Sequence, residues 1–274
     1  MKKLFFTIID LLKILKQGNY FSMRQFTSIS DNRILRILGN GQSLNDVSLT
    51  PNTKIDYLVV NRHVIGDNYT TIKPSYYVLA DPHFFYHPEG INIIKEINSK
   101  TKWPLQLYVI YKKGIKKTIK GFINNPHITL IMYNICTFNG YNKLKYLFYD
   151  WQLAMPLVQN VLVAAIMIGI QKKYSLIELY GVEHTWTKYL TVDENNIVYL
   201  DNPHFFDKEK APAKPVKEIQ HEKEYPFYLI LRNYSKMFES YWEIKNYLQT
   251  TNKNTLILNC TKGSFIDSFP KKSN

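Results

Sequence analysis

The chain has 274 residues and a mass of 32.4 kDa, enough for one large domain or two small ones. Its composition is 45% hydrophobic, 21% charged and 15% aromatic, which allows a sizeable core and excludes a disordered chain, a collagen and a coiled coil. The formal net charge of +13 indicates an anionic partner, which can be nucleic acid, a membrane surface or a phosphorylated substrate.

The first 26 residues predict an amphipathic helix. At helical spacing the apolar residues share one face and the charged ones lie elsewhere: Phe5, Ile8, Ile9, Leu12 and Leu15 against Lys3, Asp10, Lys13 and Lys16. The segment has no small-residue cleavage site and is shorter than the roughly 20 apolar residues of a membrane span. Two interpretations stay open: a helix in the interface of an anionic bilayer, or a helix packed on the domain. Both predict a cytoplasmic protein, in the first case at the cytoplasmic face of the inner membrane.

From residue 27 onward, short apolar runs alternate with helical stretches. The runs that predict strands are 34–38, 57–61, 76–81, 105–111, 128–134, 175–181 and 255–259. A helix apolar on almost every side is predicted over 153–171, and another over Ser235–Gln249. Strands separated by crossover-length segments favour an α/β fold, with a mostly parallel Rossmann-like sheet flanked by helices in one domain over 27–274.

One segment departs from this pattern. Residues 207–226, DKEKAPAKPVKEIQHEKEYP, are charged, contain proline and are poor in apolar residues. Such a composition predicts a long exposed loop or lid, and we place the lid segment at about 191–226.

Polar residues follow several of the predicted strands. Ligands of parallel α/β sheets bind beyond the carboxyl ends of the strands, where this chain has GNG at 39–41 (the start of GNGQSL, 39–44), Asn61, Asp81 and GVEH at 181–184. The two glycines of GNGQSL allow a sharp turn and a close approach to a ligand, although an ordinary tight turn has the same pattern. GNGQSL is neither a GxGxxG fingerprint nor a Walker A loop. We therefore expect these strand ends to share one crevice.

The sequence gives little support for a metal site. Asp81 precedes a proline and is expected in an Asx turn or helix cap, with a metal or ribose contact as the alternative. His83 and His87 are next to prolines, which makes a helical two-histidine metal face improbable. Cys136 and Cys260 lie far apart in the chain, so neither a disulfide scaffold nor a cysteine-based zinc site is supported.

Two histidines are candidates for a general base. His184 follows a predicted strand, and His204 stands where the lid-like segment opens. Histidine is the usual general base near neutral pH, while a hydrogen-bonded structural role is the alternative for each. There is no Gly-x-Ser-x-Gly elbow and no cysteine nucleophile motif.

Together these motifs resemble the bacterial sialyltransferases of glycosyltransferase family 42 and related transferases of surface-polysaccharide loci. GNGQSL is similar to the family's GNGPSL nucleotide loop, with Gln42 in place of proline, and Asn61 falls where the family has a strand-end asparagine. QNVLVAAIMIGI resembles the helix that approaches CMP, LIELYGVEH resembles the IYLxGID strand, and DNPHFFD resembles the segment with the catalytic histidine. The match covers most of residues 33–270, and its motifs are short.

The resemblance implies a GT-A-variant-like nucleotide-sugar transferase that moves sialic acid, or a related ulosonic acid, from a CMP-sugar to a hydroxyl of a surface glycan. The acceptor would be a glycan or glycolipid of lipopolysaccharide, capsule or O-antigen. Inversion without metal or cofactor is implied, with His204 as the favoured base and His184 as the alternative. The family's two phosphate-binding tyrosines are absent after GVE, so Tyr189 is the nearest catalytic candidate. The nucleotide contacts implied are Gly39, Asn40, Gly41, Ser43, Asn61, Gln159, Asn160, Gly181 and Thr185.

Two other functions compete with this one. A Mg-dependent diphosphokinase would need a carboxylate cluster, for which Asp81 and Glu183 are the only obvious start. A protein that binds nucleic acid or membrane through charge would use clusters such as KKGIKKTIK at 112–120, although such a run is usually a solvated face. We expect no nucleic-acid partner, and homo-oligomerisation stays open.

Overall fold

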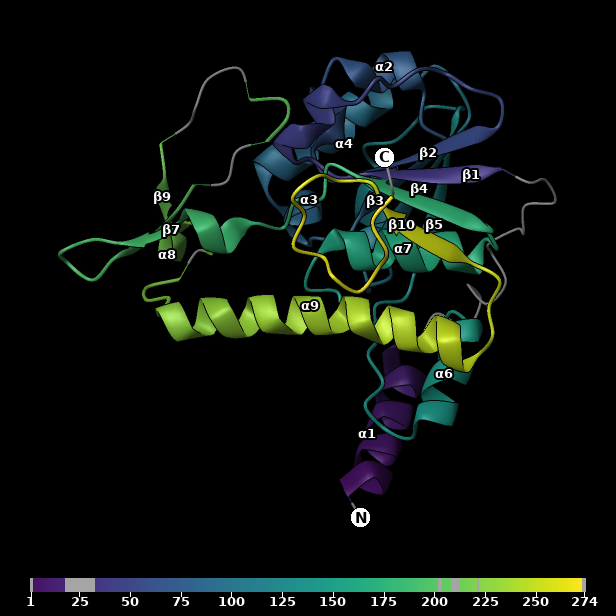
Figure 1. The fold of residues 1–274 in the computed structure, drawn as a ribbon. Coiled ribbons are helices and arrows are strands. Elements are labelled where there is room, and N and C mark those ends of the chain that lie inside the picture. Colours follow the sequence, from purple (N-terminus) through teal and green to yellow (C-terminus); the bar gives the residue numbers. More distant parts are fainter. Residues whose placement is uncertain (1, 18–32, 202–203, 208–211, 221, 273–274) are drawn as a thin grey trace.

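The structure, a computed structural model, describes residues 2–17, 33–201, 204–207, 212–220 and 222–272. Its centre is a seven-stranded sheet in the order β10-β6-β1-β2-β3-β4-β5, and all neighbouring pairs are parallel (Figure 1). The strands are β1 (Ile34–Leu38), β2 (Ile55–Val60), β3 (Tyr76–Leu79), β4 (Leu105–Ile110), β5 (Ile128–Tyr133), β6 (Leu176–Tyr180) and β10 (Leu256–Asn259). The predicted α/β fold with a mostly parallel Rossmann-like sheet is confirmed, and each predicted run overlaps one of these strands, although β2 begins two residues before the predicted run at 57–61.

Helices cover both faces of the sheet. In Figure 1, α2 (Asn68–Ile72) and α4 (Pro88–Lys100) lie on one face, and α7 (Val161–Gln171) and α9 (Phe227–Thr250) lie on the other. The other α-helices of the described residues are α1 (Lys2–Gln17), α3 (His83–Tyr86), α5 (Ile115–Lys120), α6 (Asn142–Asp150) and α8 (Val216–Ile219). The change of face follows from topology, because the chain moves outward from β1 to β5 and then returns to place β6 on the other side of β1.

The position of α7 explains its sequence. It lies between the sheet and α9, and every residue from Val161 to Ile170 is buried, as expected for a helix that is apolar on all sides. The predicted start at residue 153 is wrong, since the helix begins only after Asn160. The side chain of Asn160 accepts a hydrogen bond from the Leu162 amide at 2.8 Å and so caps the helix.

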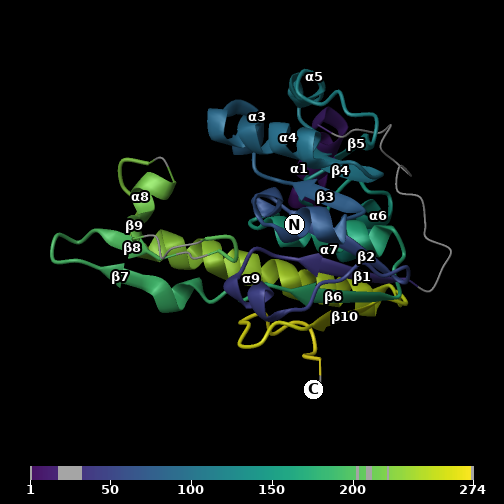
Figure 2. The same cartoon turned by 90° about the horizontal axis from the view of Figure 1, so that it is seen from above.

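A second, small sheet projects beside the first, and we call residues 190–219 the flap. Its antiparallel strands are β7 (Leu190–Val192), β8 (Val198–Leu200) and β9 (Lys214–Pro215), and Figure 2 shows it beyond the first turns of α9. Val198, Val216 and Ile230 form a separate small core there. The described part of the predicted lid thus contains secondary structure that we did not predict, because two- and three-residue strands are too short to show a period. The sequence also predicts that α9 begins at Ser235, whereas the helix begins at Phe227. The additional first turns contribute Ile230 to the small core of the flap.

The predicted N-terminal helix corresponds to α1, and residues 18–26 of that segment lie outside the described residues. Thr7, Asp10 and Ile14 are buried, so α1 packs on the domain. Throughout the ranges that the structure describes, we find no helix with the length and apolar character needed to cross a membrane.

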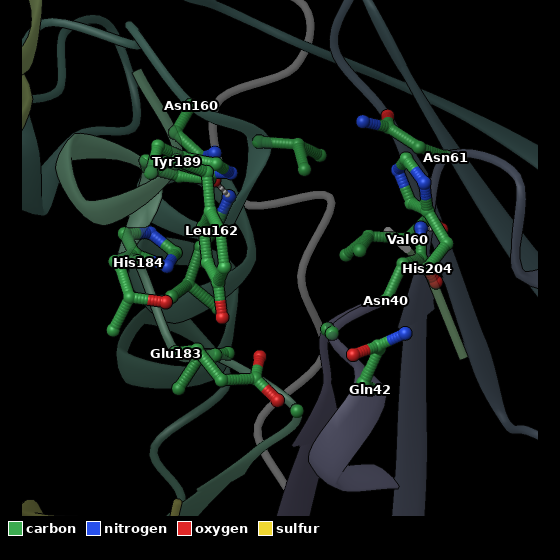
Figure 3. Close-up of a pocket in the computed structure, with 17 residues that line it drawn as sticks. Asn40, Gln42, Val60, Asn61, Asn160, Leu162, Glu183, His184, Tyr189 and His204 are labelled. Carbon is green, nitrogen blue, oxygen red and sulfur yellow. Dashed lines mark hydrogen bonds between the residues drawn. The ribbon is translucent and has the colours of Figure 1, made fainter. Parts of the chain in front are cut away.

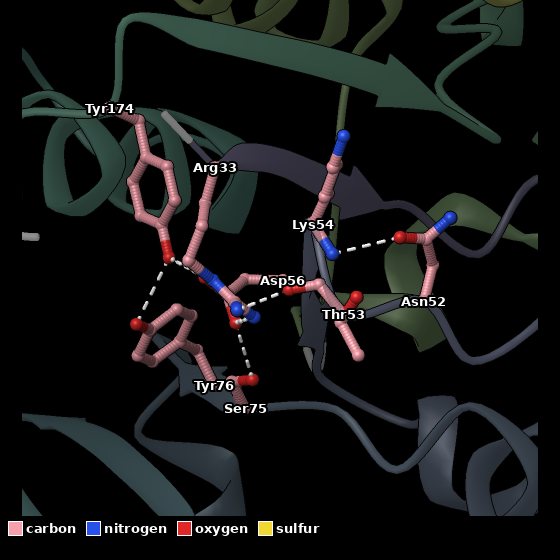
Figure 4. Close-up of polar contacts among 8 residues, drawn as sticks. All are labelled: Arg33, Asn52, Thr53, Lys54, Asp56, Ser75, Tyr76 and Tyr174. Carbon is pink, nitrogen blue, oxygen red and sulfur yellow. Dashed lines mark hydrogen bonds and ion pairs between the residues drawn. The ribbon is translucent and has the colours of Figure 1, made fainter. Parts of the chain in front are cut away.

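The N-terminal ends of the strands carry a polar cluster around Asp56, which is 5% exposed (Figure 4). Its carboxylate accepts hydrogen bonds from Arg33 Nε at 2.6 Å and Nη2 at 2.5 Å, from Tyr174 at 2.6 Å and from Ser75 at 3.0 Å. Burial alone would raise the pKa of Asp56, but the hydrogen bonds outweigh it and hold that pKa below its ordinary value. Both carboxylate oxygens are therefore satisfied, as a buried charge requires.

Candidate functional site

A cavity of about 270 Å³ opens beyond the C-terminal ends of β1, β2 and β6. The chain adds β2 to β5 on one side of β1 and later adds β6 and β10 on the other side. The cavity therefore lies at the topological switch point of the sheet, which is where parallel α/β sheets bind ligands. The lining residues are Gly39, Asn40, Gly41, Gln42, Val60, Asn61, Asn160, Val161, Leu162, Gly181, Val182, Glu183, His184, Thr185, Trp186, Tyr189 and His204. Figure 3 shows two walls, with Asn40, Asn61 and His204 facing Tyr189, His184 and Asn160.

The two glycines after β1, Gly39 and Gly41, allow the chain to pass close to the end of β6. The amide of Gly39 donates to the carbonyl of Tyr180 at 2.8 Å, and the amide of Gly41 donates to that of Gly181 at 2.9 Å. A Cβ added to Gly39 would lie 2.2 Å from the Gly181 oxygen, so no other residue fits there. We predicted glycines for close approach to a ligand; the structure shows close approach to the neighbouring strand, which aligns both loops on one rim of the cavity.

Two polar atoms at this rim, and a third on the loop next to it, lack partners among the residues that the structure describes. Asn40 Oδ1, Asn61 Oδ1 and Ser43 Oγ are buried and form no hydrogen bond with the described residues. The Asn40 amide nitrogen donates to the Val60 carbonyl at 3.2 Å, which fixes the side chain, and Asn61 has a left-handed backbone with φ of 50°. Buried polar atoms are almost always hydrogen-bonded in folded proteins, so unpartnered ones at a cavity indicate a place for a ligand.

The α7 N-terminus forms part of the opposite wall. Val161 and Leu162 line the cavity, so the positive end of the helix dipole faces it. The Oδ1 atom of Asn160 is committed to the cap, while its Nδ2 makes no hydrogen bond with the described residues. Anions bind favourably at such helix ends. Gln159, the neighbouring predicted contact, is exposed and does not line the cavity.

Glu183 links the two loops at the floor of the cavity. Its Oε1 accepts a hydrogen bond from the Ser43 amide at 2.6 Å, and its carboxylate lies against Gly41. A carboxylate here disfavours an anion on the glycine loop, whereas the positive end of the α7 dipole favours one on the opposite wall. Ser43 itself is not among the lining residues.

His184 is buried, and its side chain already has a hydrogen-bond partner within the fold. It is 7% exposed, its Nε2 lies 2.7 Å from the Tyr241 hydroxyl, and its ring packs on Trp186. Burial lowers the pKa of His184 to about 3, so the ring is neutral at neutral pH. Its Nε2 is therefore already paired with the Tyr241 hydroxyl.

His204 reaches the cavity from the flap. Its Nδ1 lies 3.6 Å from the Asp207 carboxylate, and its ring stacks on Phe206 with centroids 5.0 Å apart. The next residue holds the segment in place, because the Phe205 amide donates to the Asn40 carbonyl at 3.0 Å and the Phe205 ring packs on His63 at 4.9 Å. A histidine beside a carboxylate has the arrangement of a general base whose charged form is stabilised.

All predicted site residues except Ser43 and Gln159 line this cavity. Sequence reasoning missed Gln42, Val60, Val161, Leu162 and Trp186 as lining residues, and Phe205 and Asp207 as supports of His204. The spacing His-x-x-Asp in DNPHFFD was an available signal for Asp207. Residues 202–203 of that motif lie outside the described residues.

Other candidates lie elsewhere. Asp81 accepts the His83 amide at 2.8 Å, which is the Asx turn we expected, and it does not line the cavity. The rings of His83 and His87 stack with centroids 4.5 Å apart. Among the side chains that the structure describes, no three of His, Cys, Asp or Glu are grouped closely enough to hold a metal ion.

The chain matches no protein-family model, and a search of curated proteins likewise finds no match. Among solved structures it is similar to the monofunctional α-2,3-sialyltransferase Cst-I from Campylobacter jejuni, with a TM-score of 0.49 and 15% sequence identity. That similarity covers 92% of this chain and 84% of the other.

Proposed function

We propose that this chain is a glycosyltransferase that moves sialic acid, or a related ulosonic acid, from a CMP-sugar to a hydroxyl of a surface glycan. The observation that carries the proposal is the meeting of two elements at one cavity. A histidine beside a carboxylate comes from the flap, and unpartnered amide oxygens come from the ends of β1 and β2. The cytidine preference rests on the resemblance of the motifs.

The nucleoside would lie against the wall that holds Asn40 and Asn61. Their unpartnered oxygens accept hydrogen bonds, and cytosine and ribose supply N–H and O–H donors. The phosphate would lie at the α7 N-terminus, where the helix dipole, the Asn160 amide and the Tyr189 hydroxyl stabilise the charge of departing CMP. This placement keeps the phosphate away from the carboxylate of Glu183.

His204 would act as the base. Its neutral ring takes the proton of the acceptor hydroxyl as the oxygen bonds to the anomeric carbon, and the bond from that carbon to the CMP phosphate oxygen breaks. Attack opposite the leaving group inverts the anomeric configuration. Asp207 would stabilise the imidazolium that forms. We favour His204 over His184 because His184 already has Tyr241 as its partner and is strongly resistant to protonation.

Calorimetric titration tests the donor class. Wild type and Asn40→Ala are titrated with CMP, UMP and ATP, each with and without Mg. CMP binding without metal that is about fivefold weaker in Asn40→Ala supports the proposal, since one hydrogen bond contributes about 1 kcal/mol. Mg-dependent ATP binding without cytidine preference would replace it with the diphosphokinase. Strong, salt-dependent binding to arbitrary DNA without nucleotide binding would favour a charge-driven binding protein.

Turnover of CMP-sialic acid with a glycan acceptor then separates the histidines. We expect His204→Ala to lower kcat by about 10²- to 10⁴-fold while CMP affinity is retained. His184→Gln keeps a hydrogen-bonding partner for Tyr241, and its kcat should stay within about threefold of wild type. The reverse order of effects would make His184 the base.

A further inference from the structure

The N-terminal helix α1 presents its apolar face to the outside. Leu4, Phe5, Ile8, Leu12 and Leu15 are between 51% and 65% exposed, the largest run of exposed apolar side chains on any one helix of the described residues. These residues fall on one side of a 16-residue helix. Figure 1 shows α1 standing out from the body of the fold, with the N-terminus at its far end.

This orientation is fixed by contacts on the other side of the helix. Asp10 is fully buried and accepts a hydrogen bond from the Asn139 amide at 2.6 Å, and the Thr7 hydroxyl accepts one from the Tyr141 amide at 3.1 Å. Gly140 lets the helix come this close, because a Cβ there would lie 2.2 Å from the Thr7 hydroxyl oxygen. Turning the apolar side inward would break these hydrogen bonds. The helix therefore docks through the face that carries Thr7, Asp10 and Ile14.

The same docking leaves only cations among the exposed charged side chains of α1 itself. Asp10 is the only acidic residue of α1, and its carboxylate is buried with Lys13 as a partner at 3.0 Å. Lys2, Lys3 and Lys16 are exposed. An exposed apolar stripe with cations and no accessible acid complements an anionic lipid surface. Two copies of the same face would bring like charges together, which disfavours a dimer through α1.

We propose that α1 is a membrane-docking helix that inserts its exposed apolar face into the headgroup region of an anionic bilayer while the domain stays outside. The packing of α1 on residues 139–141 transmits this attachment to the domain. The inference rests on α1 and its contacts alone, so it stands or falls independently of the proposed sugar transfer. Its ligand is a bilayer, and a second copy of the chain is the competing occupant.

Vesicle flotation tests this inference with the full chain. The protein is floated with vesicles of phosphatidylcholine alone or of phosphatidylcholine and phosphatidylglycerol at 3:1. The variant Phe5→Ser/Ile8→Ser/Leu12→Ser changes only exposed side chains of α1. The matched control Val192→Ser/Tyr228→Ser/Leu256→Ser changes three equally exposed ones elsewhere.

We expect wild type and control to float with anionic vesicles and the α1 variant to bind at least tenfold more weakly, because apolar burial drives interfacial binding. High salt should weaken wild-type binding. Equal binding of the two variants, no dependence on phosphatidylglycerol, or no flotation of wild type would overturn the inference. A concentration-dependent dimer that the α1 variant abolishes, without flotation, would assign the face to a second copy. Turnover of a soluble acceptor should be equal in wild type and the α1 variant, which separates this test from that of the proposed function.

Discussion

The two ends of the central sheet carry polar clusters of opposite character. At the N-terminal ends of the strands, both oxygens of Asp56 are hydrogen-bonded (Figure 4). At the C-terminal ends, Asn40 Oδ1, Asn61 Oδ1 and Ser43 Oγ have no partner among the described residues (Figure 3). β2 connects the two clusters directly, since Asp56 is its second residue and Asn61 follows its last.

We infer from this difference that one cluster contributes to the stability of the protein and the other to ligand binding. A buried polar atom without a partner costs about 1–3 kcal/mol of folding free energy, which a ligand can recover by hydrogen-bonding to it. The satisfied cluster should therefore determine how stable the protein is, and the unsatisfied one should determine what it binds. Substitutions at either end test this division.

The largest effect is expected at Asp56. Asp56→Ala leaves Arg33 without its partner and removes the acceptor for Tyr174 and Ser75, which should lower the free energy of unfolding by about 3 kcal/mol. Urea denaturation measures this loss, and CMP affinity of the folded protein should not change. The exposed neighbour Lys54→Ala is the control and should stay within about 0.5 kcal/mol of wild type. A loss below 1 kcal/mol for Asp56→Ala would contradict the division.

The next effect is the response to pH, which should differ between the two ends. His63 and His184 lie at the C-terminal end of the sheet, and burial lowers the pKa of each to about 3. Below the ordinary histidine pKa of about 6.5 the unfolded chain takes up protons that the folded protein does not, so stability falls as pH decreases toward 3. The pKa of Asp56 is also lowered, but its contribution is lost only below the ordinary aspartate value, near pH 4.

Between pH 6.5 and 5 the loss should therefore come from the histidines and reach roughly 1 kcal/mol per pH unit for each. Urea denaturation across this range measures it. His184→Gln should remove about half of the slope, and the exposed His127→Gln should leave it unchanged. Equal slopes in all three proteins would show that buried histidines do not control stability in this range.

The sheet could be predicted because each strand is a compact apolar run, and parallel strands are buried on both faces. ILRIL, LQLYVI and LIELY show this in the sequence itself. The flap could not be predicted, since β9 has two residues and its small core combines Val198 and Val216 with Ile230 from α9. Such a core depends on contacts between segments far apart in the chain, which no local pattern records.

The site was predictable only as a set of strand ends. Once GNGQSL and GVEH follow parallel neighbouring strands, topology alone brings them together. The role of each side chain was not predictable. Nothing local in GVEH shows that His184 is bonded to Tyr241 on α9, or that Glu183 caps the loop at Ser43. These contacts form between distant segments, and only the structure records them.

A tenfold change in binding without a loss of stability is expected at Asn61. Its φ of 50° is a conformation that glycine adopts without strain, so Asn61→Gly removes the unpartnered oxygen while the backbone stays unstrained. CMP affinity, measured by calorimetry, should fall about tenfold, and the free energy of unfolding should stay the same or rise. Unchanged CMP affinity would remove Asn61 from the binding wall.

The smallest expected effect comes from one kind of substitution, serine to alanine, made at each end of the sheet. The Ser75 hydroxyl donates to Asp56 at 3.0 Å, whereas the Ser43 hydroxyl is buried without a partner among the described residues. Ser75→Ala should therefore cost about 1 kcal/mol of unfolding free energy, while Ser43→Ala should cost less than about 0.5 kcal/mol or stabilise the protein. Urea denaturation of both variants, with calorimetric CMP titration of Ser43→Ala, gives the two readouts. If CMP affinity falls in Ser43→Ala, its hydroxyl contacts the nucleotide although Ser43 is not among the residues that line the cavity. If instead Ser43→Ala loses as much stability as Ser75→Ala, the two clusters do not differ in the way that their hydrogen bonds indicate.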